Sequence, residues 1–250
     1  MQPVLQTKGL CKNFGGLHVT RNVDFALPVG ARHALIGPNG AGKTTFINLI
    51  TGVLAPSSGR ILIGGDDVTT LNAAARVKRG VARTFQITSL FSGLSVIDNV
   101  VLAVAERSGV SWNLVRLATT YAGVFDEARE LLKSLKIAND ANRLIRELPY
   151  GRRHLVEIAV ALALKPRILL LDEPAAGIPT HESGVILEAI DRLPSDIAVL
   201  IIEHDMKIVF RFASRITVLV RGGTLFEGTP TEVASNPLVR AVYLGASSHG

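Results

Sequence analysis

The segment Gly37-Pro38-Asn39-Gly40-Ala41-Gly42-Lys43-Thr44-Thr45 decides the fold of this 250-residue chain. From Gly37 to Thr44 it matches the pattern G-x-x-x-x-G-K-[ST], a loop whose backbone N–H groups surround a polyphosphate. Its glycines let the backbone turn sharply and approach the anion without side chains in the way. The apolar stretch Ala34-Leu35-Ile36 precedes the loop, and a helix expected after it would direct its N-terminus at the anion. The segment therefore predicts a strand-loop-helix unit that binds a nucleoside triphosphate.

Two side chains of this loop carry the expected chemistry. Lys43 would place its charge on the β and γ phosphate oxygens, and the Thr44 hydroxyl would ligate Mg²⁺. The alternative is a glycine-rich turn before an ordinary helix. The complete match in a strand-loop-helix context disfavours that alternative.

The composition describes a folded protein without a membrane span. Hydrophobic residues make up 48% of the chain, and no run reaches the roughly 18 apolar residues that cross a bilayer. The start, Met1 to Gln6, lacks the regions of a secretory signal, and the single Cys11 cannot form an internal disulfide, so a reducing cytoplasm is expected. The net charge of +6 permits nucleic acid or an anionic membrane as a partner. The basic residues are scattered, however, which favours solvated surface charge.

The apolar pattern divides the chain into three regions. Residues 4–36 alternate and turn like antiparallel strands. Between 86 and 148 helical periodicity takes over, and Ser95-Val96-Ile97-Asp98 resembles a capping box. From Ile168 onward buried strands alternate with helices, which predicts a parallel sheet, and Arg221-Gly222-Gly223 predicts a hairpin. The expected fold class is α/β.

An apolar strand, Ile168–Leu171, carries two carboxylates at its carboxyl end, where ligands bind in parallel α/β sheets. Asp172 would hold Mg²⁺ through water, and Glu173 would polarise the attacking water. An acidic strand end before the turn at Pro174 is the alternative. The phosphate-binding loop elsewhere in the chain favours the catalytic interpretation.

Two further polar residues follow predicted strands. His204 closes the strand Ile197–Ile202 and could donate a hydrogen bond to the γ-phosphate; a helix-start residue without a catalytic role is an equal alternative. Gln86, after the strand-like Val81–Phe85, could reach both the metal and the water, although a surface glutamine is the default. Leu148–His154 precedes a helix and could form an anion site at its N-terminus, or a plain loop.

The order of Gln86, Leu148–His154, Ile168–Glu173 and His204 after the phosphate-binding loop resembles the ATP-binding-cassette (ABC) ATPases over nearly the whole chain. Several segments resemble the ATPase subunit of high-affinity branched-chain amino acid importers: Ile36–Gly40, Arg83–Gln86, Asp172–Gly177, Glu203–Met206 and Asn236–Gly245. The resemblance implies ATP and Mg²⁺ as cofactors. It also implies that Phe14 stacks on adenine, that Gln86 ligates the metal, and that Tyr150 and Gly151 belong to a signature motif facing a partner subunit's ATP.

The resemblance implies an ABC-type nucleotide-binding domain with a mixed or parallel sheet core, an N-terminal antiparallel β subdomain and an inserted helical subdomain. Its expected limits are 1–88 and 148–244 for the ATP-binding core, 89–147 for the helical insert and 245–250 for a flexible tail. The implied partners are two transmembrane permease subunits, a second ABC ATPase subunit, either a copy or a related cassette, and indirectly a periplasmic solute-binding protein. The chain would sit peripherally on the cytoplasmic face of the inner membrane, with residues around Ile87–Leu94 docking on the permease.

Two departures from the family pattern stand out. Pro149 occupies the place of the signature serine whose hydroxyl meets the γ-phosphate, so the backbone N–H near Gly151 must make that contact. Arg152 and Arg153 could partly replace the lost donor, or remain solvated charges. The stretch Ala175–Ile178 lacks the aspartate typical of this region.

The same motifs are compatible with other functions. A cassette ATPase for another solute, of the urea/amide or lipopolysaccharide-export type, would share these motifs. A nucleic-acid-acting cassette ATPase would generally carry a long coiled-coil insertion or two tandem cassettes, and this chain has no sustained heptads, so no nucleic acid is expected. A small-molecule kinase would need neither a signature segment nor His204.

Overall fold

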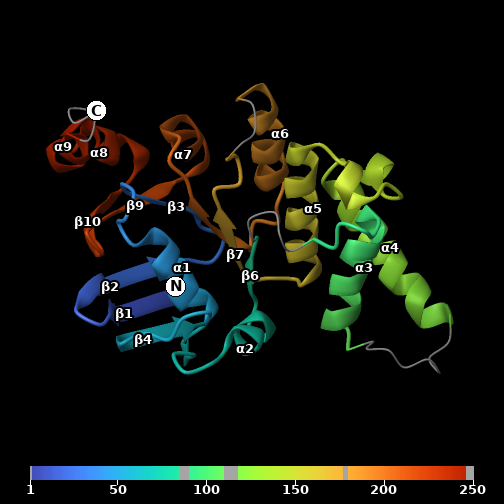
Figure 1. Ribbon diagram of the computed structural model, residues 1–250, viewed down its shortest axis with the longest axis horizontal. Helices are drawn as coiled ribbons and strands as arrows, with labels where there is room; N and C mark the ends of the chain where they lie inside the picture. The colour runs from blue at the N-terminus through green and yellow to red at the C-terminus, as the bar shows by residue number, and fades with distance from the viewer. Residues whose placement is uncertain (1, 85–89, 110–117, 177–179, 246–250) are drawn as a thin grey trace. The chain divides into compact units, whose positions relative to one another are not determined.

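The computed structural model describes residues 2–84, 90–109, 118–176 and 180–245 (Figure 1). Its residues group into two compact units. The first unit comprises Met1–Val81, Arg167–Glu173 and Pro194–Gly250, and the second comprises Ala82–Pro166 and Pro174–Leu193.

Among its described residues, the first unit contains a four-stranded antiparallel sheet in the order β2-β1-β4-β5. The strands are β1 (Leu5–Phe14), β2 (Leu17–Leu27), β4 (Ser58–Ile63) and β5 (Asp66–Asp67). β1 pairs with β2 on one side and with β4 on the other. Leu5 and Thr7 are buried while Lys8 is exposed, the alternation expected of a sheet with one solvated face. The predicted antiparallel entry is confirmed for β1 and β2.

The second sheet, over the same described ranges, has six strands in the order β10-β9-β3-β8-β7-β6. They are β3 (Arg32–Ile36), β6 (Val81–Arg83), β7 (Ile168–Asp172), β8 (Ala198–Ile202), β9 (Arg215–Val220) and β10 (Gly223–Gly228). β3 runs parallel to β8 and β9, and β7 runs parallel to β8. The antiparallel prediction for residues 4–36 is therefore wrong for 32–36, because a short strand buried on both faces joins a parallel sheet instead.

The hairpin between β9 and β10 is confirmed. β10 returns antiparallel to β9. Arg221 and Gly222 both have positive φ, 50° and 83°, as a two-residue type I′ turn requires. A Cβ on Gly222 would lie 2.3 Å from the Val19 carbonyl oxygen, so the turn needs glycine there.

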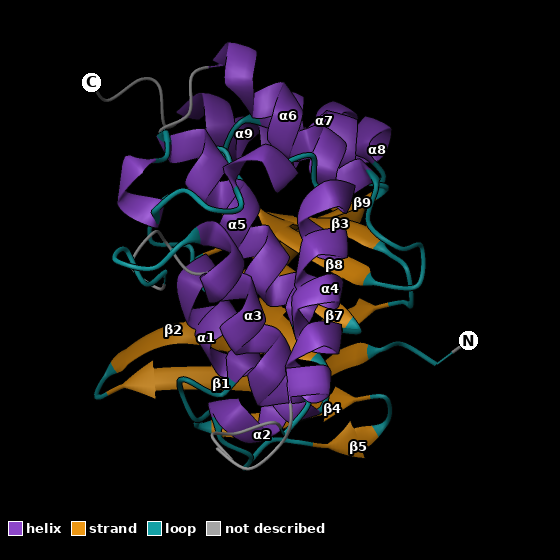
Figure 2. Ribbon diagram, turned by 90° about the vertical axis from the view of Figure 1, so that its right-hand side faces the viewer, coloured by secondary structure: helices purple, strands orange, loops and turns teal. Residues whose placement is uncertain are grey.

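Helix α1 (Lys43–Thr51) lies in the core of the first unit. Its buried side chains belong to one apolar cluster with residues of both sheets: Phe46, Ile47, Leu49 and Ile50. Helix α1 and strands of both sheets are labelled in Figure 2. Gly52, with φ 77°, ends the helix in the left-handed conformation that favours glycine. Arg76 of α2 (Ala73–Lys78) is 1% exposed and donates hydrogen bonds to the carbonyls of Leu49 and Ile50. A cation there complements the helix dipole and satisfies carbonyls that have no partner within the helix.

Three further helices follow the strands of the first unit. They are α7 (Met206–Phe212), α8 (Pro230–Ser235) and α9 (Pro237–Gly245). Asp205 caps α7 by accepting a hydrogen bond from the Lys207 N–H, and Thr229 opens α8 with a capping box that includes Glu232.

The second unit is mainly helical. Its elements are α3 (Val96–Arg107), α4 (Ala118–Ser134), α5 (Tyr150–Ala163) and α6 (Thr180–Asp191), with short 3₁₀ helices η1 (Ala138–Asp140) and η2 (Ile145–Glu147). The capping box predicted at the start of α3 is confirmed, since Ser95 and Asp98 exchange the expected bonds.

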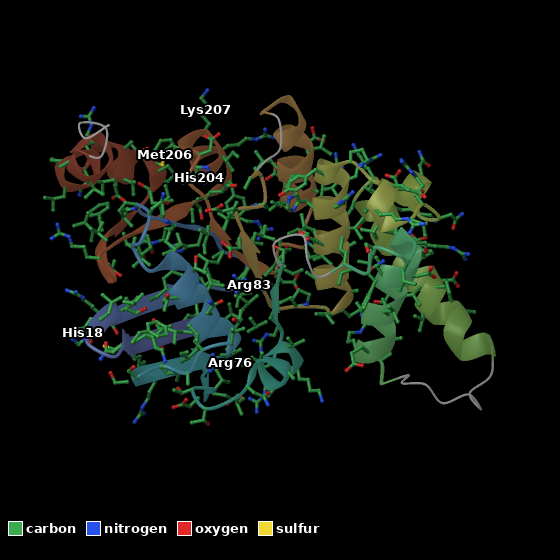
Figure 3. All side chains as sticks on the ribbon, in the orientation of Figure 1. His18, Arg76, Arg83, His204, Met206 and Lys207 are labelled. Carbon is green, nitrogen blue, oxygen red and sulfur yellow. The ribbon has the colours of Figure 1, made fainter. Side chains whose placement is uncertain are left out.

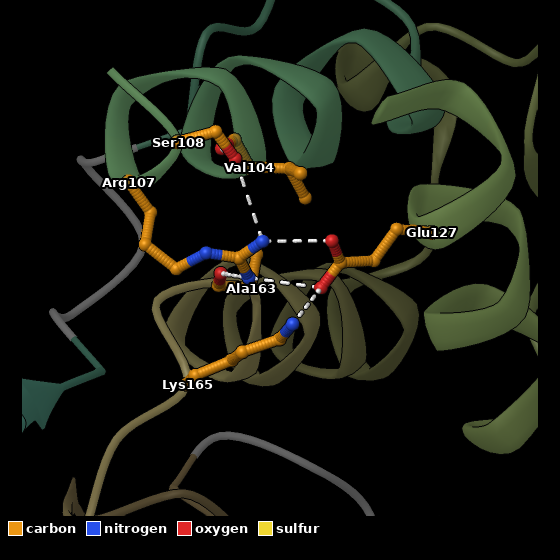
Figure 4. Close-up of polar contacts among 6 residues, drawn as sticks. All are labelled: Val104, Arg107, Ser108, Glu127, Ala163 and Lys165. Atoms are coloured by element: carbon orange, nitrogen blue, oxygen red, sulfur yellow. Dashed lines mark hydrogen bonds and ion pairs between the residues drawn. The ribbon is translucent and has the colours of Figure 1, made fainter. Parts of the chain in front are cut away.

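A charged cluster joins α3, α4 and the end of α5 (Figure 4). Both oxygens of Glu127 accept from Arg107, at 2.9 and 2.7 Å, and Lys165 Nζ lies 3.1 Å from Glu127 Oε1. Arg107 also donates to the Ala163 carbonyl at 2.6 Å. One guanidinium thus connects three helices of this unit.

Within the described ranges, no helix combines the length and the apolar character that crossing a bilayer requires.

Candidate nucleotide site

The phosphate-binding loop joins β3 to α1, as its sequence predicts. Gly42 is the N-cap of α1, with φ 97° and no side-chain cap. A Cβ on Gly42 would lie 2.6 Å from the Val19 carbonyl oxygen, so both the conformation and the space require glycine. The first N–H groups of α1 have no partner within the helix, and together with the dipole they form a site for an anion.

A pocket of about 240 Å³ opens at this loop. Its lining combines the loop with residues from β2 and from the ends of β7 and β8: Val19, Asn39, Gly40, Ala41, Gly42, Lys43, Thr44, Thr45, Glu173 and Ile202. Drug-sized ligands occupy roughly 300–1,000 Å³, so the pocket has room for part of a nucleotide. The structure thus brings the loop together with Glu173, which lies far away in sequence.

Lys43 lines the pocket, and its side chain hydrogen-bonds to the first residues of its own loop. Its Nζ donates to the carbonyl oxygens of Gly37, at 2.7 Å, and Pro38, at 3.1 Å. Burial lowers the pKa of Lys43, and the carboxylates of Glu173 and Asp172 oppose that shift. Both carboxylates therefore lie close enough to the ammonium group to act on it.

Glu173 has an uncommon backbone conformation. β7 ends at Asp172, and Glu173 follows with φ 48°, in the left-handed region that a residue with a Cβ rarely adopts. Its N–H donates to the Ile202 carbonyl at 2.9 Å, which anchors the turn to the end of β8. Such a conformation costs of order 1–3 kcal/mol and persists where the surroundings impose it, often at functional sites.

His204 follows β8 and is labelled in Figure 3. Its side chain is 68% exposed, and its Nδ1 lies 3.9 Å from Glu173 Oε1. The same Nδ1 lies 3.8 Å from Oε2 of Glu203, whose side chain is 1% exposed. Glu203 was not predicted as a site residue. Its signal in the sequence is a charged residue directly after the fully apolar strand β8.

The residues at this site fit Mg²⁺, which prefers oxygen ligands and bound phosphates. The exposed Thr44 hydroxyl lines the pocket together with Glu173, and Asp172 stands beside Glu173 at the end of β7. Gln86, the third predicted metal ligand, lies outside the described residues, so its role stays a prediction.

Phe14 ends β1 with its ring 48% exposed. Lys12 Nζ lies 5.1 Å from the ring centroid, within the range of a cation–π contact. Phe14 is not among the residues that line the pocket. Its predicted contact with adenine therefore stays a prediction.

The predicted signature residues stand at the start of α5 in the second unit. Pro149 is the N-cap and makes no side-chain cap, so the first N–H groups of the helix, including that of Gly151, have no partner within it. Arg152 Nε lies 3.1 Å from Asp140 Oδ2. Arg153 donates to the carbonyls of Leu148 and Arg146. Both arginines thus have partners inside the unit.

Of the predicted permease-docking segment, only part can be described. Phe91 is 60% exposed and Leu94 is 38% exposed. Residues 87–89 lie outside the described ranges, as do Gly177 and Ile178 of the stretch that lacks the expected aspartate.

Comparisons with known proteins agree with this geometry. Residues 20–176 match the family model described as ABC transporter, and residues 224–249 match the model described as branched-chain amino acid ATP-binding cassette transporter. The chain is 36% identical to the high-affinity branched-chain amino acid transport ATP-binding protein BraF of Pseudomonas aeruginosa and 37% identical to LivG of Escherichia coli, named for the same function. Each of these alignments covers 98% of both chains.

Another relative has a different role. The lipopolysaccharide export system ATP-binding protein LptB of Escherichia coli is 34% identical over 96% of this chain and 97% of its own length. Among solved structures, the ADP conformation of MJ1267, an ATP-binding cassette of an ABC transporter, aligns with a TM-score of 0.85 and 28% identity, over 98% of this chain and all of that one. Sequence and fold agree, and the chain belongs to the ABC transporter family of ATP-binding proteins.

Proposed function

We propose that this chain is the ATP-hydrolysing subunit of an ABC importer for branched-chain or similar amino acids. The position of Glu173 is the observation that supports ATP hydrolysis. Its carboxylate lines the same pocket as Lys43 and Thr44, and its left-handed backbone is anchored to the end of β8. A carboxylate held beside a phosphate-binding loop can accept a proton from the attacking water.

The likeness to BraF and LivG supports amino acid import, as does the match of residues 224–249 to the branched-chain model. LptB is nearly as similar, so export of a lipid-linked substrate is the second candidate. The match of residues 224–249 to the branched-chain amino acid model favours import over export.

Each residue of the pocket has a proposed part in hydrolysis. Lys43 would leave the carbonyls of Gly37 and Pro38 for the β and γ phosphate oxygens, and the N–H groups of α1 would hold the same anion. Glu173 would orient the attacking water and take its proton, while His204 would contact the γ-phosphate. Mg²⁺, held through Thr44 and Asp172, would neutralise charge on the phosphates.

The proposal includes the location of the chain and its partner subunits. The chain would work on the cytoplasmic face of the inner membrane with two permease subunits and a second ABC ATPase subunit, and indirectly with a periplasmic solute-binding protein. The helical insert, 89–147, would dock on the permease next to Gln86. Tyr150 and Gly151 would face ATP bound by the partner subunit.

Transport in vesicles tests the whole proposal. The chain is reconstituted with the proposed partners, namely a second ATPase subunit, two permease subunits and a solute-binding protein, and uptake of labelled leucine is measured with ATP hydrolysis. Glu173→Gln should lower hydrolysis at least about a hundredfold, because a general base contributes that much or more, and should abolish uptake. It should still bind ATP, because the glutamine retains the shape of the pocket.

Glu227→Gln is the matched control, since it removes a partly exposed carboxylate of β10 that accepts hydrogen bonds from Arg215 and Thr217 and does not line the pocket. It should hydrolyse ATP and transport leucine like the wild type. Hydrolysis that survives in Glu173→Gln would contradict the assignment of the base. ATP-driven movement of a lipopolysaccharide, with no uptake of leucine, would contradict the importer.

A further inference from the structure

The ring of His204 lies beside two carboxylates with different surroundings. Glu173 Oε1 is 3.9 Å from Nδ1 and belongs to a side chain that is 35% exposed. Glu203 Oε2 is 3.8 Å from the same nitrogen and belongs to a side chain that is 1% exposed. Both acids face the same edge of the imidazole.

Glu203 is held where it stands. Its Oε2 accepts a hydrogen bond from the backbone N–H of His204 at 3.1 Å. The residue directly follows β8, whose five residues are all buried. A carboxylate buried this deeply has little freedom to move, and leaving it without compensating contacts would be costly.

We infer that Glu203 is a positioning residue for His204, which it keeps from being drawn onto Glu173. The inference rests on the proposed roles of His204 and Glu173. Since a second carboxylate lies at nearly the same distance, Nδ1 is not drawn to Glu173 alone, and the Glu173 carboxylate stays available to the attacking water. Because Nδ1 faces the carboxylates, Nε2 lies on the opposite edge of the ring, where it can meet a phosphate oxygen.

The test is a double-mutant cycle between Glu203 and His204. Glu203→Gln keeps the shape and an oxygen for the His204 N–H but removes the charge. It should lower kcat for ATP about tenfold, since a small misplacement of a catalytic group has effects of this size or larger. KM for ATP should stay unchanged, since the phosphate-binding loop is intact. In a His204→Ala background the same change should cause no further loss, because the residue through which Glu203 acts is gone.

A second measurement needs no nucleotide. The ¹H–¹³C signals of the His204 ring, assigned by their absence in His204→Ala, should shift in Glu203→Gln and stay in place in Glu227→Gln. If Glu203→Gln proves unstable, Glu203→Asp keeps the charge but withdraws it from the ring. It should give a smaller loss of kcat that again disappears in the His204→Ala background.

The outcomes separate this inference from the function on which it rests. If His204→Ala hydrolyses ATP at the wild-type rate, the proposed role of His204 fails. If His204→Ala is impaired while Glu203→Gln is fully active with unshifted ring signals, only the role of Glu203 is wrong. Equal losses from Glu203→Gln in both backgrounds would make Glu203 a structural residue and would also overturn the inference.

Discussion

His33 is a fully buried histidine in β3, close before the phosphate-binding loop. Its Nε2 lies 2.8 Å from Thr217 Oγ1, and that hydroxyl donates to Glu227. The hydroxyl therefore accepts from Nε2–H, which makes Nδ1 the site of protonation. No described residue offers Nδ1 a hydrogen bond. Burial lowers the pKa of His33 to about 4; the charge of Glu227 opposes this shift and that of Arg215 adds to it.

This histidine should make the protein sensitive to mild acid. Between the unfolded pKa near 6.5 and the folded value of about 4, the unfolded chain binds more protons, so stability is complete above pH 6.5 and falls as the pH drops through this window. At pH 5 the loss from His33 should be about 2 kcal/mol relative to pH 7.5. Urea unfolding of the wild type and of His33→Gln at both pH values measures it.

The comparison of the two proteins isolates His33, because every other side chain is the same in both. The wild type should lose more stability between pH 7.5 and pH 5 than His33→Gln does. Equal losses would mean that His33 does not hold a lowered pKa in the folded protein.

Residue types near the phosphates could be predicted from the sequence, whereas their surroundings could not. Lys43, Asp172, Glu173 and His204 follow from motifs at strand ends. The left-handed φ of Glu173 and the approach of its carboxylate to His204 depend on β7 and β8 being neighbours. Pairing between strands that are distant in sequence leaves no local signal.

At the scale of elements, charged side chains fix helix ends. In the first unit Arg76 holds the last carbonyls of α1, the helix that begins at the phosphate-binding loop. In the second unit Arg107 and Lys165 hold Glu127 of α4, and Arg107 also binds the Ala163 carbonyl at the end of α5 (Figure 4). Hydrogen bonds from Arg107, followed by one from Lys165, lower the pKa of Glu127 to about 2.

Glu127→Gln should therefore loosen α4 from α3 and α5. A charge-assisted pair of this kind contributes about 1–2 kcal/mol, so the free energy of unfolding should fall by about that amount at pH 7. Because the folded pKa is lowered, this contribution is present above pH 4.5 and is lost as the pH falls toward 2. Urea unfolding and hydrogen exchange of the α4 amides measure the effect.

Glu130→Gln is the control on the same helix. Its partner Lys133 is three residues away on α4, and both side chains are more than 60% exposed. Removing this pair should change stability by less than about 0.5 kcal/mol, because exposed pairs contribute little. If the two variants lose the same stability, the cluster around Arg107 does not join the helices.

At the scale of the whole molecule, the predicted nucleotide contacts are divided between the two units. The phosphate-binding loop, Glu173 and His204 belong to the first, whereas Tyr150 and Gly151 belong to the second. Under the proposed function, the helix start at Gly151 serves ATP held by another subunit. Pro149 supplies no hydroxyl there, so the backbone N–H groups of α5 must make the contact.

Trapped ATP should therefore pair two copies of the chain. Purified Glu173→Gln should double its mass in light scattering when ATP is added, because unhydrolysed ATP would join the loop of one copy to the signature of the other. Adding Lys43→Ala to this variant should keep it monomeric by removing the phosphate contact. A mass that does not respond to ATP in Glu173→Gln would contradict self-pairing.

The sequence by itself determined the phosphate-binding loop, the carboxylates after β7, the capping box of α3 and the β9–β10 turn. Each depends on residues close together along the chain, where motif and backbone preference act locally. Only the tertiary structure decided that β3 lies between β8 and β9, that Glu173 lines the pocket of the phosphate-binding loop, and that Glu173 approaches His204. These arrangements arise from the burial of strands distant in sequence, and burial depends on the packing of the whole unit, which no single segment specifies.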